Sequence, residues 1–317
     1  THATGIDASN DRAIYRYSAG STSRYVQAGS IFFGAPEGPF ASLDDFRDAP
    51  AVSQDGLPAV FATLVTGPGG VPANQSQGIW ATDSNTDFIM IAQQGTPAHE
   101  LPGLVYEADF TSPVISSTAD IAYRAKIRQG AGGVDSTNDV GIWIRLLQDE
   151  THYLLARSGD LIGHGDVAEA RFDVLGTPVV TSEPRVGFHA SMRIGTADVT
   201  PDNDAGLFTR CPCGSVFLEA REGAQAQNLP TGAVYDSFSN PAFTRDGRLL
   251  FGAKLRGTGV EASNDTTIWW ADPPVNFVPV AREGSAAPGG GVFAEFDFAA
   301  PEFWLAPVLG NQLVFPG

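Results

Sequence analysis

The sequence is poor in lysine and rich in acids. Of its 19 basic residues only Lys126 and Lys254 are lysines, and 36 acidic residues leave a net charge of −17. Phosphate binding needs clustered cations, so this balance argues against nucleic acid or an anionic membrane as partner. No apolar run approaches the roughly 18 residues of a membrane-spanning helix, which argues against membrane insertion.

Cysteine is equally scarce. The two cysteines, Cys211 and Cys213, stand in "RCPCGS". A C-x-C pair supplies half of a structural zinc site and no second pair exists, so we expect a strained local disulfide or two free thiols. No metal site and no cofactor is predicted, although a calcium ion held by several loops stays open.

Helical periodicity, a Gly-x-Ser-x-Gly motif and a phosphate-cradling loop are all missing. A repeat takes their place. It is marked by five aromatic residues, and successive members are 61 to 65 residues apart: Tyr15, Trp80, Trp143, Phe208 and Trp269. Counting from Trp269 off the C-terminus and back in to Tyr15 gives 63 residues, the interval expected of a closed ring.

A polar Asn-Asp element precedes most of these aromatics, as in "STNDVGIW" (136–143). Its members are Asn10, Asp11, Asn138, Asp139, Asn203, Asp204, Asn264 and Asp265, with a looser copy in "NQSQGIW" (74–80). Asn and Asp suit turns, and the residues that follow look like a strand entering a core. We interpret the element as a construction unit used five times, not as five binding sites.

A second repeated pattern lies between the aromatics, as in "PAFTRDGRLLFGAKL" (241–255). It predicts a short strand, a tight turn and an alternating strand, followed by a loop and two further strands. Four antiparallel strands in each of five repeats of about 63 residues predict an all-β fold. The architecture is a five-bladed β-propeller in a single domain over 1–317.

The stretch P-x-x-[ST]-x-D-G-x-x-x-F within this pattern resembles the blade repeats of TolB-type and related WD40-like propellers. Whole units also resemble tandem repeats of secreted bacterial proteins with an N-x-x-G-x-[FW] pattern. The resemblance implies that the first strand of each unit lines a central channel. Ala119-Asp120 and Pro184-Arg185 depart from it by replacing Asp-Gly.

In that register the last blade is composite, built from residues 1–30 and 301–317. We expect inner strands near 307–310 and 312–316, and outer strands near 13–17 and 22–28. The N- and C-terminal strands together would then close the ring.

Arginine ends the fourth strand in three units, at Arg157, Arg221 and Arg282. One interpretation is a partial ring that grips an anionic ligand. The alternative, which we favour, is pairing with Asp139, Asp204 and Asp265 across neighbouring strands, worth roughly 0.2–1 kcal/mol each. Trp270 and Trp304 do not recur in the repeat, which makes them candidates for a single specific site.

A glycosidase needs two carboxylates roughly 5–9 Å apart. The predicted innermost strands read "AVS", "VIS", "VVT", "AFT" and "VLG", without Asp or Glu. We therefore expect a non-enzymatic extracellular module, a rigid scaffold for contacts with other proteins or with copies of itself. A glycan-binding lectin and a polysaccharide-active glycoside hydrolase are the alternatives. The chain begins at Thr1 without Met, so we expect an exported bacterial protein, extracellular or on the cell surface, from which a signal peptide has been removed.

Overall fold

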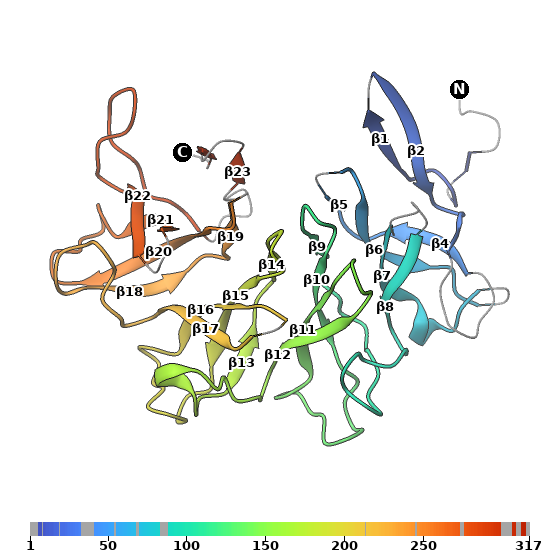
Figure 1. Cartoon of the computed structure of the whole chain (residues 1–317), viewed down its shortest axis with the longest axis horizontal. Coiled ribbons are helices and arrows are strands. Elements are labelled where there is room, and N and C mark those ends of the chain that lie inside the picture. Colours follow the sequence, from blue (N-terminus) through green and yellow to red (C-terminus); the bar gives the residue numbers. More distant parts are fainter. Residues whose placement is uncertain are drawn as a thin grey trace. The chain divides into compact units, whose positions relative to one another are not determined.

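The computed structural model describes most of the chain. The described residues are 6–7, 9–18, 20–32, 41–53, 55–67, 70–82, 88–212, 214–244, 246–272, 276–298, 306–308 and 312–314. Contacts divide the chain into two compact units, Thr1–Leu154 and Leu155–Gly317, with the boundary inside a strand. Figure 1 labels the strands of both.

The first unit contains two antiparallel sheets. One has the order β3-β4-β6-β7-β8, with β5 also on β6. Its strands are β3 (Ile31–Phe32), β4 (Ala41–Phe46), β5 (Ala51–Val52), β6 (Pro58–Leu64), β7 (Gln77–Thr82) and β8 (Phe88–Gln93). The other has the order β12-β11-β10-β9. Its strands are β9 (Val114–Ile115), β10 (Ile121–Lys126), β11 (Val140–Arg145) and β12 (His152–Arg157).

The second unit repeats this plan. The order β13-β15-β16-β17, with β14 also on β15, is followed by β18-β20-β21-β22, with β19 also on β20. The strands are β13 (Phe172–Leu175), β14 (Val179–Val180), β15 (Val186–Met192), β16 (Ala205–Arg210), β17 (Val216–Arg221), β18 (Ala233–Phe238), β19 (Ala242–Phe243), β20 (Leu249–Gly257), β21 (Thr266–Asp272) and β22 (Asn276–Arg282). Helix in the described residues is limited to two 3-10 turns, Ala73–Gln75 and Gly165–Val167. The all-β class is confirmed.

Two short ribbons lie near the chain ends. The strands β1 (Ala13–Ser18) and β2 (Ser21–Gln27) form one, and β23 (Ala306–Val308) and β24 (Gln312–Val314) form the other. The predicted terminal strands are thus confirmed individually, and their union into one blade stays a prediction. Tyr15 in β1 is 62% exposed, unlike the other aromatics of the repeat.

The repeated aromatics explain the Gly-x-aromatic pattern. Trp80, Trp143, Phe208 and Trp269 are completely buried. Trp143 pairs across strands with Tyr123, and the two rings stack with centroids 5.8 Å apart. The Trp143 ring also folds back over Gly141, where an added Cβ would lie 2.5 Å from a ring carbon. A side chain at position 141 would therefore clash with the Trp143 ring.

The first edge of three sheets consists of two consecutive strands, which corrects the sequence-based assignment. The strands β4, β13 and β18 lie upstream of β5, β14 and β19, and both members of each pair contact the same second strand. The predicted innermost segments carry no Asp or Glu, but the upstream strands on the same neighbour carry Asp45, Asp173 and Asp236. In the sequence, β5, β14 and β19 each appear as two apolar residues after a proline. This pattern gives no sign that an upstream strand pairs with the same neighbour.

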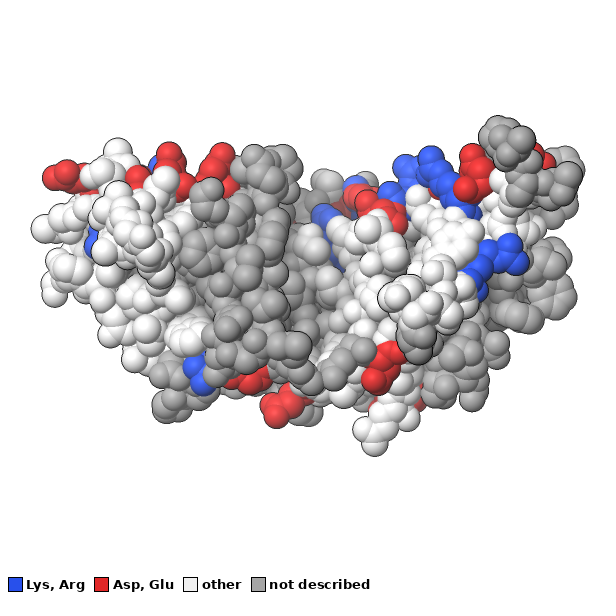
Figure 2. Space-filling model, turned by 90° about the horizontal axis from the view of Figure 1, so that it is seen from above, with Lys and Arg blue, Asp and Glu red and all other residues white. Residues whose placement is uncertain are grey.

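Each of these upstream acids pairs with an arginine: Asp45 with Arg12 at 2.6 Å, and the other two with arginines on or directly after the neighbouring strand. The Arg256 Nε atom lies 3.0 Å from Asp236, and Arg193 Nε lies 3.9 Å from Asp173. Glu107 and Arg128 form the corresponding pair in the second repeat, at 3.0 Å. On the face seen in Figure 2, acidic and basic side chains accordingly occur beside one another among uncharged surface.

Candidate functional site

The Asn-Asp element is a construction unit, as predicted. Each Asn side chain accepts a backbone N–H from three residues earlier, which closes a turn. The pairs are Asp7 to Asn10 (2.8 Å), Asp135 to Asn138 (2.9 Å), Thr200 to Asn203 (2.8 Å) and Glu261 to Asn264 (3.1 Å). These asparagines therefore satisfy the loop backbone, and Asn203 also lines the pocket described below.

Arg221 and Arg282, at the end of the fourth strand, support the same loop through its backbone, and the pairing of Arg157, Arg221 and Arg282 with an Asp stays a prediction. Arg221 Nε donates to the backbone carbonyl of Asn203 at 2.9 Å, and Arg282 Nε donates to that of Asn264 at 2.9 Å. Gln93 donates to the carbonyl of Gln75 in the same way, at 2.6 Å. The bond is to the residue before the predicted Asp, so glutamine can replace arginine without losing it.

The Asp carboxylates have other partners. Asp139 lies 3.5 Å from the Lys126 ammonium, and Asp265 lies 3.3 Å from that of Lys254. The only two lysines of the chain thus occupy the same place on the second strand of two different repeats. In the third repeat that place is taken by Ser191, which is paired with Ala205, next to Asp204.

Without a lysine, Asp204 shares its surroundings with another acid. Glu222, directly after Arg221, is hydrogen-bonded to Asp204. Burial, together with the negative charge of Asp204 and this hydrogen bond, raises the pKa of Glu222 to about 7. Its backbone N–H donates to the carbonyl of Ala205 at 2.9 Å, and a hydrogen bond from the Ala205 backbone to the carboxyl group partly offsets the rise in pKa. Glu222 therefore carries a proton close to neutral pH.

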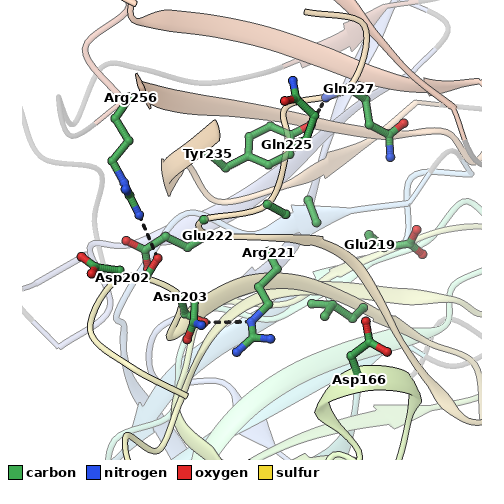
Figure 3. Close-up of a pocket in the computed structure, with 14 residues that line it drawn as sticks. Asp166, Asp202, Asn203, Glu219, Arg221, Glu222, Gln225, Gln227, Tyr235 and Arg256 are labelled. Carbon is green, nitrogen blue, oxygen red and sulfur yellow. Dashed lines mark hydrogen bonds between the residues drawn. The ribbon is translucent and has the colours of Figure 1, made fainter. Parts of the chain in front are cut away.

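Glu222 lines a pocket of about 610 Å³ in the second unit (Figure 3). Arg221 lies between two groups of acids, with Glu222 and Asp202 on one side and Glu219 and Asp166 on the other. Arg256 donates to the backbone carbonyl of Asp202 at 3.0 Å. The walls thus present carboxyl, guanidinium and amide groups, which suit a ligand rich in hydroxyl groups.

The remaining predicted residues do not line this pocket. Arg157 lines a separate, smaller cavity of the same unit. Trp270 lies under the Arg248 guanidinium, whose Cζ atom is 5.1 Å from the ring centroid. Trp304 and Cys213 lie outside the described residues. Sequence reasoning missed Glu222, although Ser191 in place of a lysine was a visible departure from the repeat.

The second repeat holds a different polar cluster. The hydroxyl groups of Tyr106 and Tyr123 lie 3.0 Å apart, and Tyr123 lies 3.3 Å from Nδ1 of His152. The rings of His152 and His99 stack with centroids 3.5 Å apart. Burial lowers the pKa of both histidines, that of His152 to about 3, so His152 is neutral near pH 7.

Two further properties bear on function. Within the described part of the chain, no three His, Cys, Asp or Glu side chains gather closely enough to hold a metal ion. The described residues also contain no helix that is long and apolar enough to cross a membrane.

Residues 1–303 match a family of unknown function, DUF7453. The chain belongs to this family. No curated protein matches the sequence. The resemblance to TolB-type repeats stays a prediction.

Solved structures similar to this chain include two fungal enzymes. An α-L-arabinanase of Penicillium chrysogenum, complexed with arabinobiose, has 8% identity and a TM-score of 0.36, over 77% of this chain and 67% of its own. An α-L-arabinofuranosidase of Fusarium graminearum, bound to an iminosugar inhibitor, has 10% identity and a TM-score of 0.34, over 83% and 72%. Overlaps this loose transfer none of the enzymes' chemistry to this chain.

Proposed function

We propose that the pocket of the second unit is the active site of a glycoside hydrolase, with Glu222 as the general acid. The observation that carries this proposal is the carboxyl pair of Asp204 and Glu222, in which the pKa of Glu222 is raised to about 7. A carboxyl group that stays protonated near neutral pH can donate a proton to a departing oxygen.

The reaction assigns a role to each wall of the pocket. Glu222 gives its proton to the glycosidic oxygen as the bond to the anomeric carbon breaks. Water then bonds to that carbon and gives a proton to a carboxylate on the other side of Arg221, either Glu219 or Asp166. Asp204 acts through Glu222, because its hydrogen bond orients the acid.

A non-enzymatic binding module is the second candidate. The Asp204 and Glu222 carboxyl groups share a hydrogen bond, so they are not the separated pair of a glycosidase, which here would be Glu222 with Glu219 or Asp166. Such a pair, beside Arg221, Gln225 and Arg256, can also bind the hydroxyl groups of a glycan without cleaving it.

One experiment separates the two candidates. Reducing-sugar release and calorimetric binding are measured on a panel of neutral and acidic polysaccharides, for the unaltered protein, Glu222→Gln and Glu283→Gln. Glu283 occupies the equivalent position of the next repeat, one residue after Arg282, and is the matched control. Hydrolysis that disappears only in Glu222→Gln, with binding retained, supports the enzyme.

The other outcomes are equally informative. Binding without product, weakened by Arg221→Ala, supports the binding module and overturns the enzyme. Hydrolysis that survives in Glu222→Gln places the chemistry elsewhere.

The architecture we propose around this site is a closed five-bladed propeller, in which β1 and β2 join β23 and β24 in the last blade. Tyr15 is 62% exposed, whereas the aromatic residue at the equivalent position of the other repeats is fully buried. This difference supports the proposal, because β1 would gain the neighbouring strand that it lacks. Deleting residues 1–30 should abolish cooperative unfolding, and an unchanged melting transition would contradict closure.

The scaffold role, contact with proteins or copies of itself, and the extracellular location stay predictions from the sequence. Analytical ultracentrifugation that shows a monomer at high concentration would count against self-assembly.

A further inference from the structure

One aromatic side chain of the second unit is exposed beside the Glu222 pocket. Phe217 lies in β17 and is 48% exposed, and Glu219, two positions further along the strand, lines the pocket. A single exposed phenylalanine is ordinary on a protein surface. This one differs from its counterparts, because the equivalent positions of the first and fourth repeats, by register with the third strand, hold the partly buried Ile89 and Val278.

A histidine holds the exposed ring. The rings of Phe217 and His164 meet edge to face, with centroids 4.8 Å apart and an interplanar angle of 61°. Together these two residues form an aromatic platform. His164 stands directly before the 3-10 turn Gly165–Val167, whose Asp166 lines the same pocket. The platform therefore comes from the same two segments as Glu219 and Asp166, which lie on the same side of the pocket in Figure 3.

The loop that carries His164 departs from the repeat. Isolated bridges close the corresponding loops of four repeats, at Pro97–Val105, Leu161–Arg171, Gln225–Val234 and Ala286–Val292. The loop closed by Leu161 and Arg171 encloses nine residues, 162–170, and is the longest of the four. Of these four loops, all within the described residues, it alone contains a helical turn. The construction of a blade thus requires neither the longer loop nor an aromatic ring at position 217.

Thr209 connects the aromatic platform to the pocket wall. It is paired with Phe217 between β16 and β17, it is 1% exposed, and its hydroxyl donates to Glu219 Oε1. Two positions along a strand span at most about 7 Å. This distance is comparable with one sugar unit of a glycan chain. A saccharide that extends out of the pocket past Glu219 therefore reaches the ring of Phe217.

We propose that the aromatic platform is a subsite that stacks on the next sugar unit of a saccharide bound in the Glu222 pocket. The face of an aromatic ring carries partial negative charge, and the C–H groups of a sugar ring carry partial positive charge, so the two attract each other. The contact with His164 fixes the Phe217 ring before the ligand arrives, which lowers the cost of ordering it on binding.

The charges around the platform indicate the class of ligand. The carboxylates of Asp166 and Glu219 repel an acidic substituent at this unit, so the ligand is a neutral oligosaccharide or polysaccharide. The subsite rests on the proposed function, which places a saccharide in the pocket, and it serves the enzyme and the binding module alike.

The test removes the ring while it keeps an apolar side chain. Binding of cellotetraose, xylotetraose, mannotetraose and arabinotetraose is measured by calorimetry, and reducing-sugar release from the same probes is measured in parallel. Phe217→Leu should weaken binding about five- to tenfold, which corresponds to one aromatic contact, whereas Phe217→Trp should retain it. Val280→Ala is the matched control, because Val280 is 40% exposed on β22 of the next repeat and should not affect binding.

A variant in the pocket shows whether pocket and platform share one ligand. One tetrasaccharide bound per chain, with losses in both Arg221→Ala and Phe217→Leu, supports the subsite. Unchanged affinity in Phe217→Leu, an equal loss in Phe217→Trp or Val280→Ala, or no binding of any probe would overturn it. Binding that depends on Phe217 without any product keeps the subsite and removes the enzyme. Hydrolysis that depends on Glu222, with binding indifferent to Phe217, keeps the enzyme and removes the subsite.

Discussion

The third repeat differs from the second and fourth at one point of the Asn-Asp loop. In the second and fourth repeats, Lys126 and Lys254 lie 3.5 and 3.3 Å from the carboxylates of Asp139 and Asp265. In the third repeat Ser191 replaces the lysine, and Asp204 is hydrogen-bonded to Glu222 instead.

The backbone of the loop is unaffected by this exchange. The carbonyls of Asp139, Asp204 and Asp265 each accept a backbone N–H from the second strand at 2.6 Å. The lysine is therefore not needed to form the loop. The comparison shows that a charged side chain can be exchanged on this scaffold while the strands keep their register. One repeat can therefore carry a site that the other repeats lack.

The largest effect should come from restoring the lysine. Ser191→Lys places an ammonium group beside Asp204, which should lower the pKa of Glu222 toward its ordinary value. If Glu222 is the general acid, kcat near pH 7 should fall about 100-fold, within the range that such catalysis contributes. The measurement is a pH profile of kcat. An unchanged pH profile of kcat would show that the absence of a lysine at position 191 does not set the pKa of the general acid.

Acid should lower the stability contribution of His152 in the second repeat, and raise that of Glu222 in the third. The pKa of His152 is lowered to about 3, so the folded state disfavours its proton. The contribution of His152 to the free energy of unfolding is complete above pH 6.5 and is lost as the pH falls from 6.5 toward 3. We expect a loss of about 2 kcal/mol in the free energy of unfolding between pH 7 and pH 4, measured by denaturant titration. His152→Phe keeps a ring against His99 and should flatten this dependence.

Glu222 gives a smaller effect of the reverse sign. Its pKa is raised above that of the unfolded chain, so the folded state binds the proton more tightly. Its contribution is complete below pH 4.5 and is lost as the pH rises from 4.5 to about 7. After allowance for solvent screening we expect about 1 kcal/mol. The free energy of unfolding of the unaltered protein should therefore fall relative to that of Glu222→Gln across this range, and a constant difference would contradict the assignment.

The smallest effect should come from removing a lysine. Lys254→Ser reproduces the third repeat in the fourth, where Glu283 already stands at the position of Glu222. The exposed ion pair with Asp265 is worth about 0.5 kcal/mol, so Lys254→Ser should lower the free energy of unfolding near pH 7 by about this amount. Lys254→Arg is the control, and an equal loss in both variants would show that charge is not the cause.

The sequence predicted those features that depend on neighbours along the chain. The spacing of the aromatics, the Asn-Asp turns and the strands near both termini all follow from local patterns, and the structure contains them. It did not predict the upstream strands β4, β13 and β18, because their pairing with β6, β15 and β20 is a choice between segments well separated in the chain.

The sequence by itself determined a β-rich repeat with a buried aromatic in each of the four large sheets, since alternation, turn residues and the Gly-x-aromatic pattern act over a few residues. Only the tertiary structure decided which charges meet. Arg221 reaches the carbonyl of Asn203, and Glu222 is hydrogen-bonded to Asp204. Both contacts depend on the register between β16 and β17, where a one-residue irregularity decides which side chain faces which.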